Sequence, residues 1–456
     1  MNRRDFIKHT TAAVAGTSVL LAACKRAGSQ QPDNGSAPEG DGQMTVRVNP
    51  NSGDHVSLLG YGMMRLPTED TGSARGNGNA PIDQEAVNEL VDYALAHGVN
   101  YFDTSPVYCQ GKSEQSTGIA LARHPRNSYY IATKLSNFSP EAWPREESQA
   151  MFNRSLEYLQ TDYIDYLLLH SIGGGSPGKG AVETFYARFM DNGILDWLVE
   201  QKQKGIIRNL GFSYHGDVRV FDMLLRWHDE GKYHWDFVQI QLNYLDWNHA
   251  KQNNPRNTNA SYLYTELEKR GIPAVIMEPL LGGRLARQPE NILSEMKSMD
   301  INATPAEWAF RYSGTPKGIL TVLSGMTYME HLRENCATYS PLRPITAEED
   351  AMLMRLADEI CALEAIPCTG CNYCMPCPYG LNIPAIFGYY NNRLTEESVS
   401  ARKWLVGYDR AVPRERQADH CIGCNRCIPS CPQRIDIPKE MRRIDNLVEQ
   451  FKSSQP

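Results

Sequence analysis

The 456-residue sequence predicts an α/β protein: a (β/α)8 barrel followed by a small, mostly helical domain rich in cysteine. Eight short apolar segments alternate with amphipathic helical stretches, which is typical of parallel β/α units. Eight such units over ~270 residues fit a closed barrel. In addition, eight of the twelve cysteines lie between 368 and 431. Their close spacing favours metal ligation over disulfides.

Changes in composition divide the chain into four parts. We expect a signal peptide over 1–24, a flexible tether over 25–43, the barrel over 44–345, and a helix with the cysteine-rich domain over 346–456. The tether is dominated by Gly, Ser, Gln, Pro, Asn and Asp and has almost nothing to bury.

The first part has the features of an export signal. Arg3 and Arg4 precede an apolar stretch from Thr10 to Ala23, as in a twin-arginine signal. A general secretion signal or a basic tail is the alternative. Cys24 follows Leu-Ala-Ala and resembles a lipobox cysteine, although ordinary signal cleavage is also open. We therefore expect a periplasmic or membrane-anchored lipoprotein.

Charge and hydropathy exclude two classes of protein. Residues 1–23 carry +2 of a formal net charge of −7, so the remainder carries −9. A nucleic-acid binder would instead present a basic face. No run of ~18 uncharged apolar residues occurs, so no membrane-spanning helix is expected and the membrane is reached only through Cys24.

Each expected strand is short, rich in branched or aromatic residues, and flanked by Gly, Pro or Asn. The eight segments are Leu58–Leu66, Asn100–Thr104, Tyr129–Lys134, Ile164–His170, Ile207–Tyr214, Phe237–Asn243, Ala274–Pro279 and Ile319–Gly325. A doubly wound open sheet is the competing fold, but no Gly-x-Gly-x-x-Gly follows the first segment. Thr45–Leu58 is expected to form a hairpin before the barrel.

Four polar residues stand at or just after the ends of three consecutive segments. Asp103 is the penultimate residue of the second segment and Tyr108 follows five residues later, while Lys134 closes the third segment and His170 the fourth. The carboxyl ends of barrel strands meet at one rim, and neighbouring strands lie ~4.8 Å apart. These side chains can therefore converge there, although each alone would suit a structural role.

Such a group can reduce a carbonyl. A tyrosine has a pKa near 10, and a nearby ammonium lowers it by favouring the phenolate. We expect Lys134 to act in this way on Tyr108, with Asp103 holding Lys134 in place. Tyr108 then donates a proton to the carbonyl oxygen as a hydride reaches the carbon, and His170 orients that oxygen.

The segment Phe-Asp103-Thr-Ser-x-x-Tyr108, with Ser113-Glu114 and Gly118 after it, resembles the signature of the aldo-keto reductases. Lys134 and His170 fall where that family has its other catalytic residues. The resemblance covers about 45–340 and implies a (β/α)8 barrel. It also implies nicotinamide-dependent carbonyl reduction of a small-molecule substrate.

The resemblance also suggests cofactor contacts. Ser213 and Gln239 match positions that bind the carboxamide, and Met277 stands where many members stack a tyrosine on the nicotinamide. Met277-Glu-Pro279-Leu280 resembles the Met-Glu-Pro-Leu branch of the family. The adenosine end would be held by Ser324, Gly325, Met326, Glu334 and Asn335. The branch lacks the basic pair that grips a 2′-phosphate elsewhere, so both NADP and NAD remain open. The glycine-rich run Gly173–Gly180 is expected to form a substrate loop or a simple flexible loop.

The tail begins with an expected helix over Thr346–Leu363, capped by Thr346 with Glu349 three residues later. The two cysteine runs follow: Cys368, Cys371, Cys374 and Cys377, then Cys421, Cys424, Cys427 and Cys431. The second run has the C-x2-C-x2-C-x3-C-P spacing of bacterial 4Fe-4S ferredoxins. The first departs from it in its last gap. Two zinc sites are the alternative.

We therefore expect two 4Fe-4S clusters. In two-cluster ferredoxins the fourth cysteine of each run serves the other cluster. That rule assigns Cys431 to the first run and Cys377 to the second, although the shorter gap before Cys377 leaves the crossing open. The Met-Glu-Pro-Leu branch carries a similar C-terminal domain, which supports the prediction.

The sequence thus predicts an exported oxidoreductase that exchanges a hydride between NADP or NAD and a carbonyl or alcohol, with clusters that serve electron transfer or structure. An electron-transfer partner is possible. The alternative is a non-catalytic, nucleotide-binding or electron-relay subunit of a membrane-associated redox complex. A third hypothesis is that the clusters only fasten the tail to the barrel.

Overall fold

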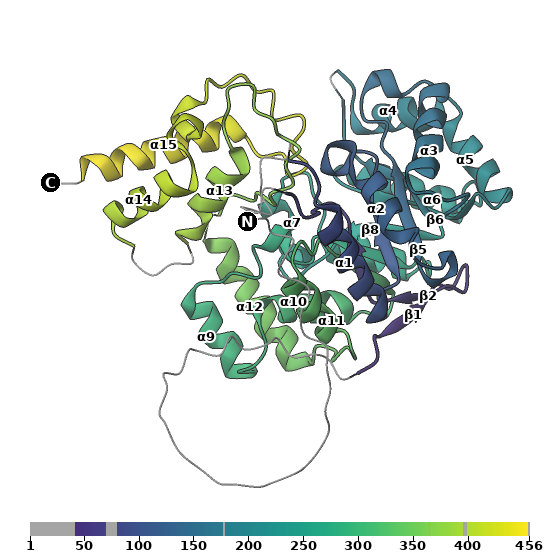
Figure 1. The fold of residues 1–456 in the computed structure, drawn as a ribbon, viewed down its shortest axis with the longest axis horizontal. Coiled ribbons are helices and arrows are strands. Elements are labelled where there is room, and N and C mark those ends of the chain that lie inside the picture. The colour runs from purple at the N-terminus through teal and green to yellow at the C-terminus, as the bar shows by residue number, and fades with distance from the viewer. Residues whose placement is uncertain (1–41, 70–79, 177, 364, 395–398, 455–456) are drawn as a thin grey trace, which may run out of the picture. The chain divides into compact units, whose positions relative to one another are not determined.

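The computed structural model describes residues 42–69, 80–176, 178–363, 365–394 and 399–454 (Figure 1). The expected signal peptide, with Arg3, Arg4 and Cys24, lies outside the described residues, as does nearly all of the expected tether. Within the described ranges, no helix is both long and apolar enough to cross a bilayer.

The chain begins with the expected hairpin. Strand β1 (Val46–Val48) pairs antiparallel with β2 (His55–Ser57), and Val46 faces Ser57. Val56 on β2 is fully buried and packs with apolar side chains inside the barrel, among them Tyr101 and Tyr166. The hairpin therefore contributes to the apolar filling that makes the barrel interior a packed core.

The eight expected strands close into a parallel barrel, which confirms the predicted fold class. The strands are β3 (Leu59–Gly62), β4 (Tyr101–Asp103), β5 (Tyr130–Leu135), β6 (Ile164–Ile172), β7 (Ile207–Tyr214), β8 (Phe237–Gln241), β9 (Ala274–Met277) and β10 (Ile319–Ser324). Their order follows the chain, and β10 pairs with β3 through Val322 and Leu59 to complete the ring. All carboxyl ends consequently face one rim.

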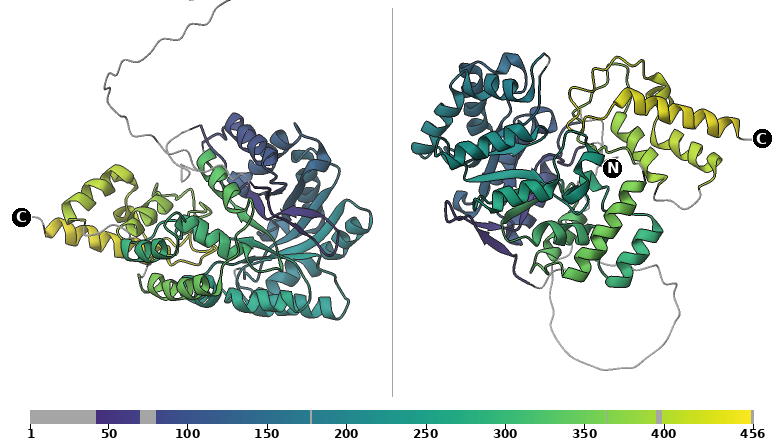
Figure 2. Two further views of the ribbon diagram at one scale, coloured as in Figure 1. Left: turned by 90° about the horizontal axis from the view of Figure 1, so that it is seen from below. Right: turned by 180° about the vertical axis from the view of Figure 1, so that it is seen from behind.

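Helices surround these strands (Figure 2). They are α1 (Gln84–Ala96), α2 (Ser113–Leu121), α3 (Arg145–Tyr158), α4 (Ala181–Phe185), α5 (Ile194–Gln203), α6 (Val218–Asp229), α7 (Asp246–Asn253), α8 (Ala260–Glu268), α9 (Glu290–Met299), α10 (Pro305–Gly314) and α11 (Met329–Thr338). In α1, the carboxylate of Asp83 caps the first turn by accepting from the Ala86 N–H, and Val87, Leu90, Val91 and Ala94 form the buried face.

Helix α12 (Ala347–Ala362) has the expected capping box between Thr346 and Glu349. Its apolar face, including Leu353 and Leu356, belongs to the same core as the barrel helices. The buried Arg311 side chain of α10 donates to Glu349 at 2.6 Å. The helix that we grouped with the tail by sequence thus packs as part of the barrel.

The C-terminal region builds a second hydrophobic core around helices α13 (Ile383–Asn392), α14 (Ala401–Ala411) and α15 (Ile437–Ser453) (Figures 1 and 2). Phe387, Tyr408 and Met441 are buried at its centre. Cysteines of both runs pack against its edge. This region is mostly helical, as the sequence predicts.

Both cysteine runs are hydrogen-bonded to the barrel rim. The Arg65 guanidinium, just beyond β3, donates to the backbone carbonyls of Thr369 and Gly370. On the second run, Asn254 donates to the Pro432 carbonyl at 3.1 Å. Gly282 adopts a left-handed backbone with φ +66°, and a Cβ there would lie 2.5 Å from the Thr369 Cα. Only glycine allows so close an approach between the two segments.

Candidate active site at the barrel mouth

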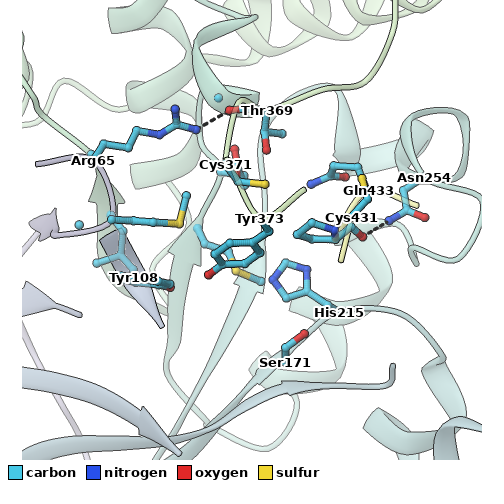
Figure 3. Close-up of a pocket in the computed structure, with 18 of the residues that line it drawn as sticks. Arg65, Tyr108, Ser171, His215, Asn254, Thr369, Cys371, Tyr373, Cys431 and Gln433 are labelled. Carbon is cyan, nitrogen blue, oxygen red and sulfur yellow. Dashed lines mark hydrogen bonds between the residues drawn. The ribbon is translucent and has the colours of Figure 1, made fainter. Parts of the chain in front are cut away.

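A large cavity opens at the carboxyl ends of the strands, with a volume of about 1670 Å³ (Figure 3). Its wall includes Asp103, Tyr108 and His170 from the barrel, and Thr369, Tyr373 and Gln433 from the C-terminal region. Ordinary small-ligand pockets measure roughly 300–1,000 Å³. The cavity therefore has room for a dinucleotide and a small second molecule together.

Asp103 and Lys134 form a buried ion pair below Tyr108. The Lys134 ammonium donates to Asp103 Oδ1 and to the Thr104 carbonyl, both at 2.7 Å. Lys134 Nζ also lies 4.6 Å from the centre of the Tyr108 ring, which is cation–π distance. Asp103 Oδ2 is buried and has no hydrogen-bond partner among the described residues. Asp103, Lys134 and Tyr108, which the sequence predicts to converge, therefore lie together.

The pKa of Tyr108 differs from the sequence expectation. Burial raises it well above the usual value near 10, and the neighbouring Asp103 carboxylate adds to the rise. We expected the Lys134 ammonium to lower the pKa of Tyr108. It does not, because Asp103 balances the ammonium charge within the same buried pair. Burial likewise raises the pKa of Asp103 and lowers that of Lys134. At neutral pH, Tyr108 is therefore a phenol that can donate its proton.

His170 is held as a neutral ring. Burial lowers its pKa well below the usual value, and the Lys134, Arg188 and His215 charges contribute to the lowering. Its Nδ1 is 2.6 Å from the Ser136 hydroxyl, and its ring meets Tyr108 edge to face at 5.9 Å. With Nδ1 bonded to Ser136, Nε2 is the remaining ring nitrogen for a cavity ligand.

Most of the cofactor residues suggested by the resemblance line the cavity: Gln239, Met277, Pro279, Leu280, Ser324, Gly325, Glu334 and Asn335. Ser213 and Met326 do not. The Ser213 hydroxyl accepts from the Ser171 N–H at 2.7 Å, and Met326 is buried. The glycine-rich loop also reaches the cavity, through Gly173, Gly174, Gly175, Ser176 and Lys179.

Gln239 provides a test of whether a nicotinamide fits. Its side chain is 2% exposed, lines the cavity, and has an Oε1 without a hydrogen-bond partner among the described residues. A buried amide oxygen left unpaired costs about 1–3 kcal/mol. The NH₂ group of a bound carboxamide would supply the missing donor. The residues present therefore fit a nicotinamide dinucleotide.

Several cavity residues escaped the sequence analysis. Tyr373 stands between Cys371 and Cys374, and its ring enters the cavity between Tyr108 and His215 (Figure 3). His215 follows β7, and burial lowers its pKa to about 4. Glu278 is half-buried, and burial raises its pKa overall, although the Arg65 charge acts to lower it. Position after a barrel strand was a usable signal for His215 and Glu278, but the sequence gives no signal that Tyr373 docks here.

The cysteines group across the two runs. Cys368, Cys371, Cys374 and Cys431 line one small cavity of about 20 Å³. Cys427 instead has Cys421, Cys424 and Cys377 as electrostatic neighbours. Both groups match the crossed ligand sets. Among the described residues, no three or more His, Cys, Asp or Glu side chains are grouped closely enough to hold a single metal ion.

Comparison with known proteins decides the family. The family model described as "Aldo/keto reductase family" matches residues 58–357. The chain belongs to the aldo/keto reductase family. A second model, "4Fe-4S dicluster domain", matches residues 367–435, so this aldo/keto reductase carries a C-terminal 4Fe-4S domain.

Two curated relatives are sugar dehydrogenases by name. L-galactose dehydrogenase from Arabidopsis thaliana is 27% identical over 326 residues, covering 68% of this chain and 92% of the relative. D-arabinose 1-dehydrogenase from Saccharomyces cerevisiae is 34% identical over 136 residues, covering 28% and 36%. The family assignment identifies this chain as an NAD(P)-dependent oxidoreductase.

Solved structures agree on the barrel. An aldo-keto reductase from Bacillus halodurans in its holo form has a TM-score of 0.52 and 25% identity, covering 69% of this chain and 96% of that chain. An aldo-keto reductase from Klebsiella pneumoniae in complex with NADPH has a TM-score of 0.50 and 21% identity, covering 69% and 95%. The second likeness shows the fold alone.

The crossed cysteine sets predict a specific pattern of iron loss. Two 4Fe-4S clusters would hold about eight iron atoms per chain, and Cys371→Ala or Cys431→Ala should each lower this to about four. Their double variant should also keep about four, because both cysteines serve one cluster. Cys371→Ala with Cys377→Ala should lose nearly all iron.

Iron analysis of the anaerobically purified full chain measures this, and electron paramagnetic resonance checks that the remaining cluster is intact. Cys361→Ala, a cysteine outside both runs, is the matched control and should keep all the iron. About four irons in the Cys371/Cys377 double variant would instead mean that each run holds its own cluster.

Proposed function

We propose that the chain reduces a small carbonyl compound, or oxidises the corresponding alcohol, with NADP or NAD. One observation carries the proposal: Tyr108, His170 and the Asp103–Lys134 pair converge on a cavity that also presents the unpaired Gln239 oxygen. The sugar dehydrogenases among the relatives support a substrate of sugar size with a carbonyl or hemiacetal carbon.

A bound reduced nicotinamide would supply the hydride; the chain's own residues handle the oxygen. Neutral His170 directs its ring toward the carbonyl oxygen and orients it. As negative charge develops there, Tyr108 transfers its hydroxyl proton to that oxygen. Lys134, packed on the tyrosine ring, stabilises the phenolate that remains, and Asp103 fixes Lys134 in position.

Tyr108→Phe removes the proton donor while leaving the ring and its packing. Turnover with NADPH and an aldehyde should fall by about 10²–10⁴-fold, the usual contribution of general acid catalysis. Nucleotide binding, followed by the fluorescence of bound NADPH, should be unchanged. Because burial keeps the pKa of Tyr108 above 10, wild-type reduction should not lose its acid between pH 6 and 9.

Tyr158→Phe is the matched control, since it removes an exposed tyrosine hydroxyl outside the cavity. It should retain full turnover. Equal activity of Tyr108→Phe and the wild-type chain would refute the assigned acid.

Electron exchange with the clusters is a second candidate function. It is favoured by one observation: Cys371 and Cys431, both assigned to one cluster, line the cavity that holds Tyr108. A hydride carries two electrons and a 4Fe-4S cluster accepts one, so exchange would have to engage both clusters or a further carrier. An electron-transfer partner would then receive the electrons.

Anaerobic titration of the full chain with NADPH distinguishes the two functions. Loss of the visible cluster absorbance would establish that nicotinamide and clusters exchange electrons. Unchanged absorbance, with NADPH bound, would leave a carbonyl reductase whose clusters are structural or serve another partner.

We also propose export by the twin-arginine route and attachment through a lipid on Cys24, on the strength of the Arg3-Arg4 pair and the lipobox-like segment. That route carries folded proteins, which suits a chain that must receive its clusters before export. Cell fractionation tests this: replacing both arginines by lysine should retain the chain in the cytoplasm, and Cys24→Ala should release it from the membrane. Unaltered fractionation of both variants would exclude the proposal.

A further inference from the structure

Two arginines in the cavity have no part in the proposed reaction. Arg256 lies on the connection between α7 and α8, and Arg434 follows Cys431 in the C-terminal region. Both side chains line the cavity that holds Tyr108 and His170. They approach it from different halves of the chain, so only the docked C-terminal region brings them together.

These guanidinium charges are not neutralised. Neither Arg256 nor Arg434 forms an ion pair with any described residue. The Asn254–Pro432 hydrogen bond at 3.1 Å joins the two segments, and each of these residues comes two positions before one of the arginines in the wall of the same cavity. Two like charges held together are unfavourable unless an anion is placed between them.

The acidic residues of the cavity wall are engaged elsewhere. Asp103 pairs with Lys134, and Glu334 accepts from the Thr304 hydroxyl at 2.5 Å. Glu278 is half-buried and interacts electrostatically with Arg65. The region around Arg256 and Arg434 thus carries a local positive charge within a chain whose formal net charge is −7.

The position of Arg434 limits the size of a molecule that reaches both it and the reaction centre. A Cβ at Gly174 would lie 3.7 Å from Nη2 of Arg434, and Gly174 comes four residues after His170. Four residues span at most ~14 Å of extended chain. A single small molecule within the cavity can therefore reach both Arg434 and His170.

We propose that Arg256 and Arg434 form an anion subsite for the substrate, so that the protein acts on carbonyl compounds carrying a carboxylate or phosphate group at the far end. The proposal rests on the proposed carbonyl reduction and adds the charge of its substrate. Guanidinium groups suit both oxyanions because each can make paired N–H···O bonds to them. The C-terminal region then contributes directly to substrate specificity through Arg434.

A competing explanation involves Cys431, whose backbone carbonyl accepts from the Arg434 N–H at 3.1 Å. In that case Arg434 would compensate the charge of a neighbouring cluster and take no part in substrate binding. Arg256 separates the two explanations because it belongs to the barrel and has no cluster cysteine next to it in the chain. A loss of substrate binding on replacing Arg256 would therefore not result from a disturbed cluster.

The test uses three probes that differ only at the end far from the carbonyl: D-galactose, D-galacturonate and D-galactose 6-phosphate. Binding is measured by calorimetry on the full cluster-containing chain with NADP bound, in the Tyr108→Phe background so that turnover is suppressed. We expect at least one charged probe to bind ten-fold or more tightly than galactose, with the preference falling at high salt.

Arg256→Gln and Arg434→Gln should each abolish most of that preference without changing galactose binding. Arg256→Lys, which keeps the charge and loses the paired bonds, should retain part of it. Arg287→Gln removes another cavity arginine, on the connection after β9, and as the matched control should keep the preference. Preference for galacturonate alone identifies a carboxylate substrate, and preference for the phosphate alone a phosphorylated one.

Equal binding of all three probes would overturn the anion subsite. A shift of the cluster reduction potential in Arg434→Gln, with probe binding unchanged in both arginine variants, would overturn it in favour of the cluster explanation. Reduction of the neutral aldehyde 4-nitrobenzaldehyde by the wild-type chain and NADPH is measured in parallel. Its presence alongside a failed anion preference would refute the subsite and leave the proposed reduction standing.

Discussion

The architecture of the active site depends on the contact between the backbone at Thr369 and Gly370 and the barrel rim. Arg65 donates to both carbonyls, and Gly282 leaves just enough room for the Thr369 backbone. Thr369 and Gly370 lie between Cys368 and Cys371, so the segment that holds these two predicted cluster ligands also forms part of the cavity wall. Any change in how the cysteines are ligated would thus be transmitted to the barrel mouth over a few bonds.

Burial determines the protonation states that the proposed reaction needs. It keeps Tyr108 protonated and His170 neutral, so both can act as hydrogen-bond donors to one oxygen. The positive charge of Lys134 is tolerated in the same surroundings because Asp103 is 2.7 Å away. The C-terminal region contributes to this burial by placing Tyr373 over the site. The same region that carries the clusters therefore helps to exclude water from the reaction centre.

Local sequence patterns predicted the elements well, because strand periodicity, caps and cysteine spacing are short-range signals. The eight apolar segments all became barrel strands, and Thr346 with Glu349 formed its capping box. Side-chain direction at strand ends was less predictable: the Ser213 hydroxyl turns to a neighbouring backbone N–H. The pKa of Tyr108 was expected to fall because the sequence shows the nearby lysine but not the depth of burial. Tyr373 and Arg434 could not be anticipated, since docking between distant segments leaves no periodic trace.

Because the C-terminal region packs against the barrel mouth, deleting it cannot show separately what the clusters do and what the barrel does. If the clusters only fastened the C-terminal region to the barrel, removal of this region would lower the stability of the protein. If they only relayed electrons, its removal would abolish only the activity that depends on electron transfer. In this structure the region also supplies cavity wall through Tyr373, Gln433 and Arg434. Truncation would therefore open the cavity, expose Tyr108 to water and remove a cation together, and all three roles would fail at once. Single substitutions at side chains that face the cavity, leaving the cysteines untouched, are what distinguish a substrate-binding role from a structural or electron-transfer one.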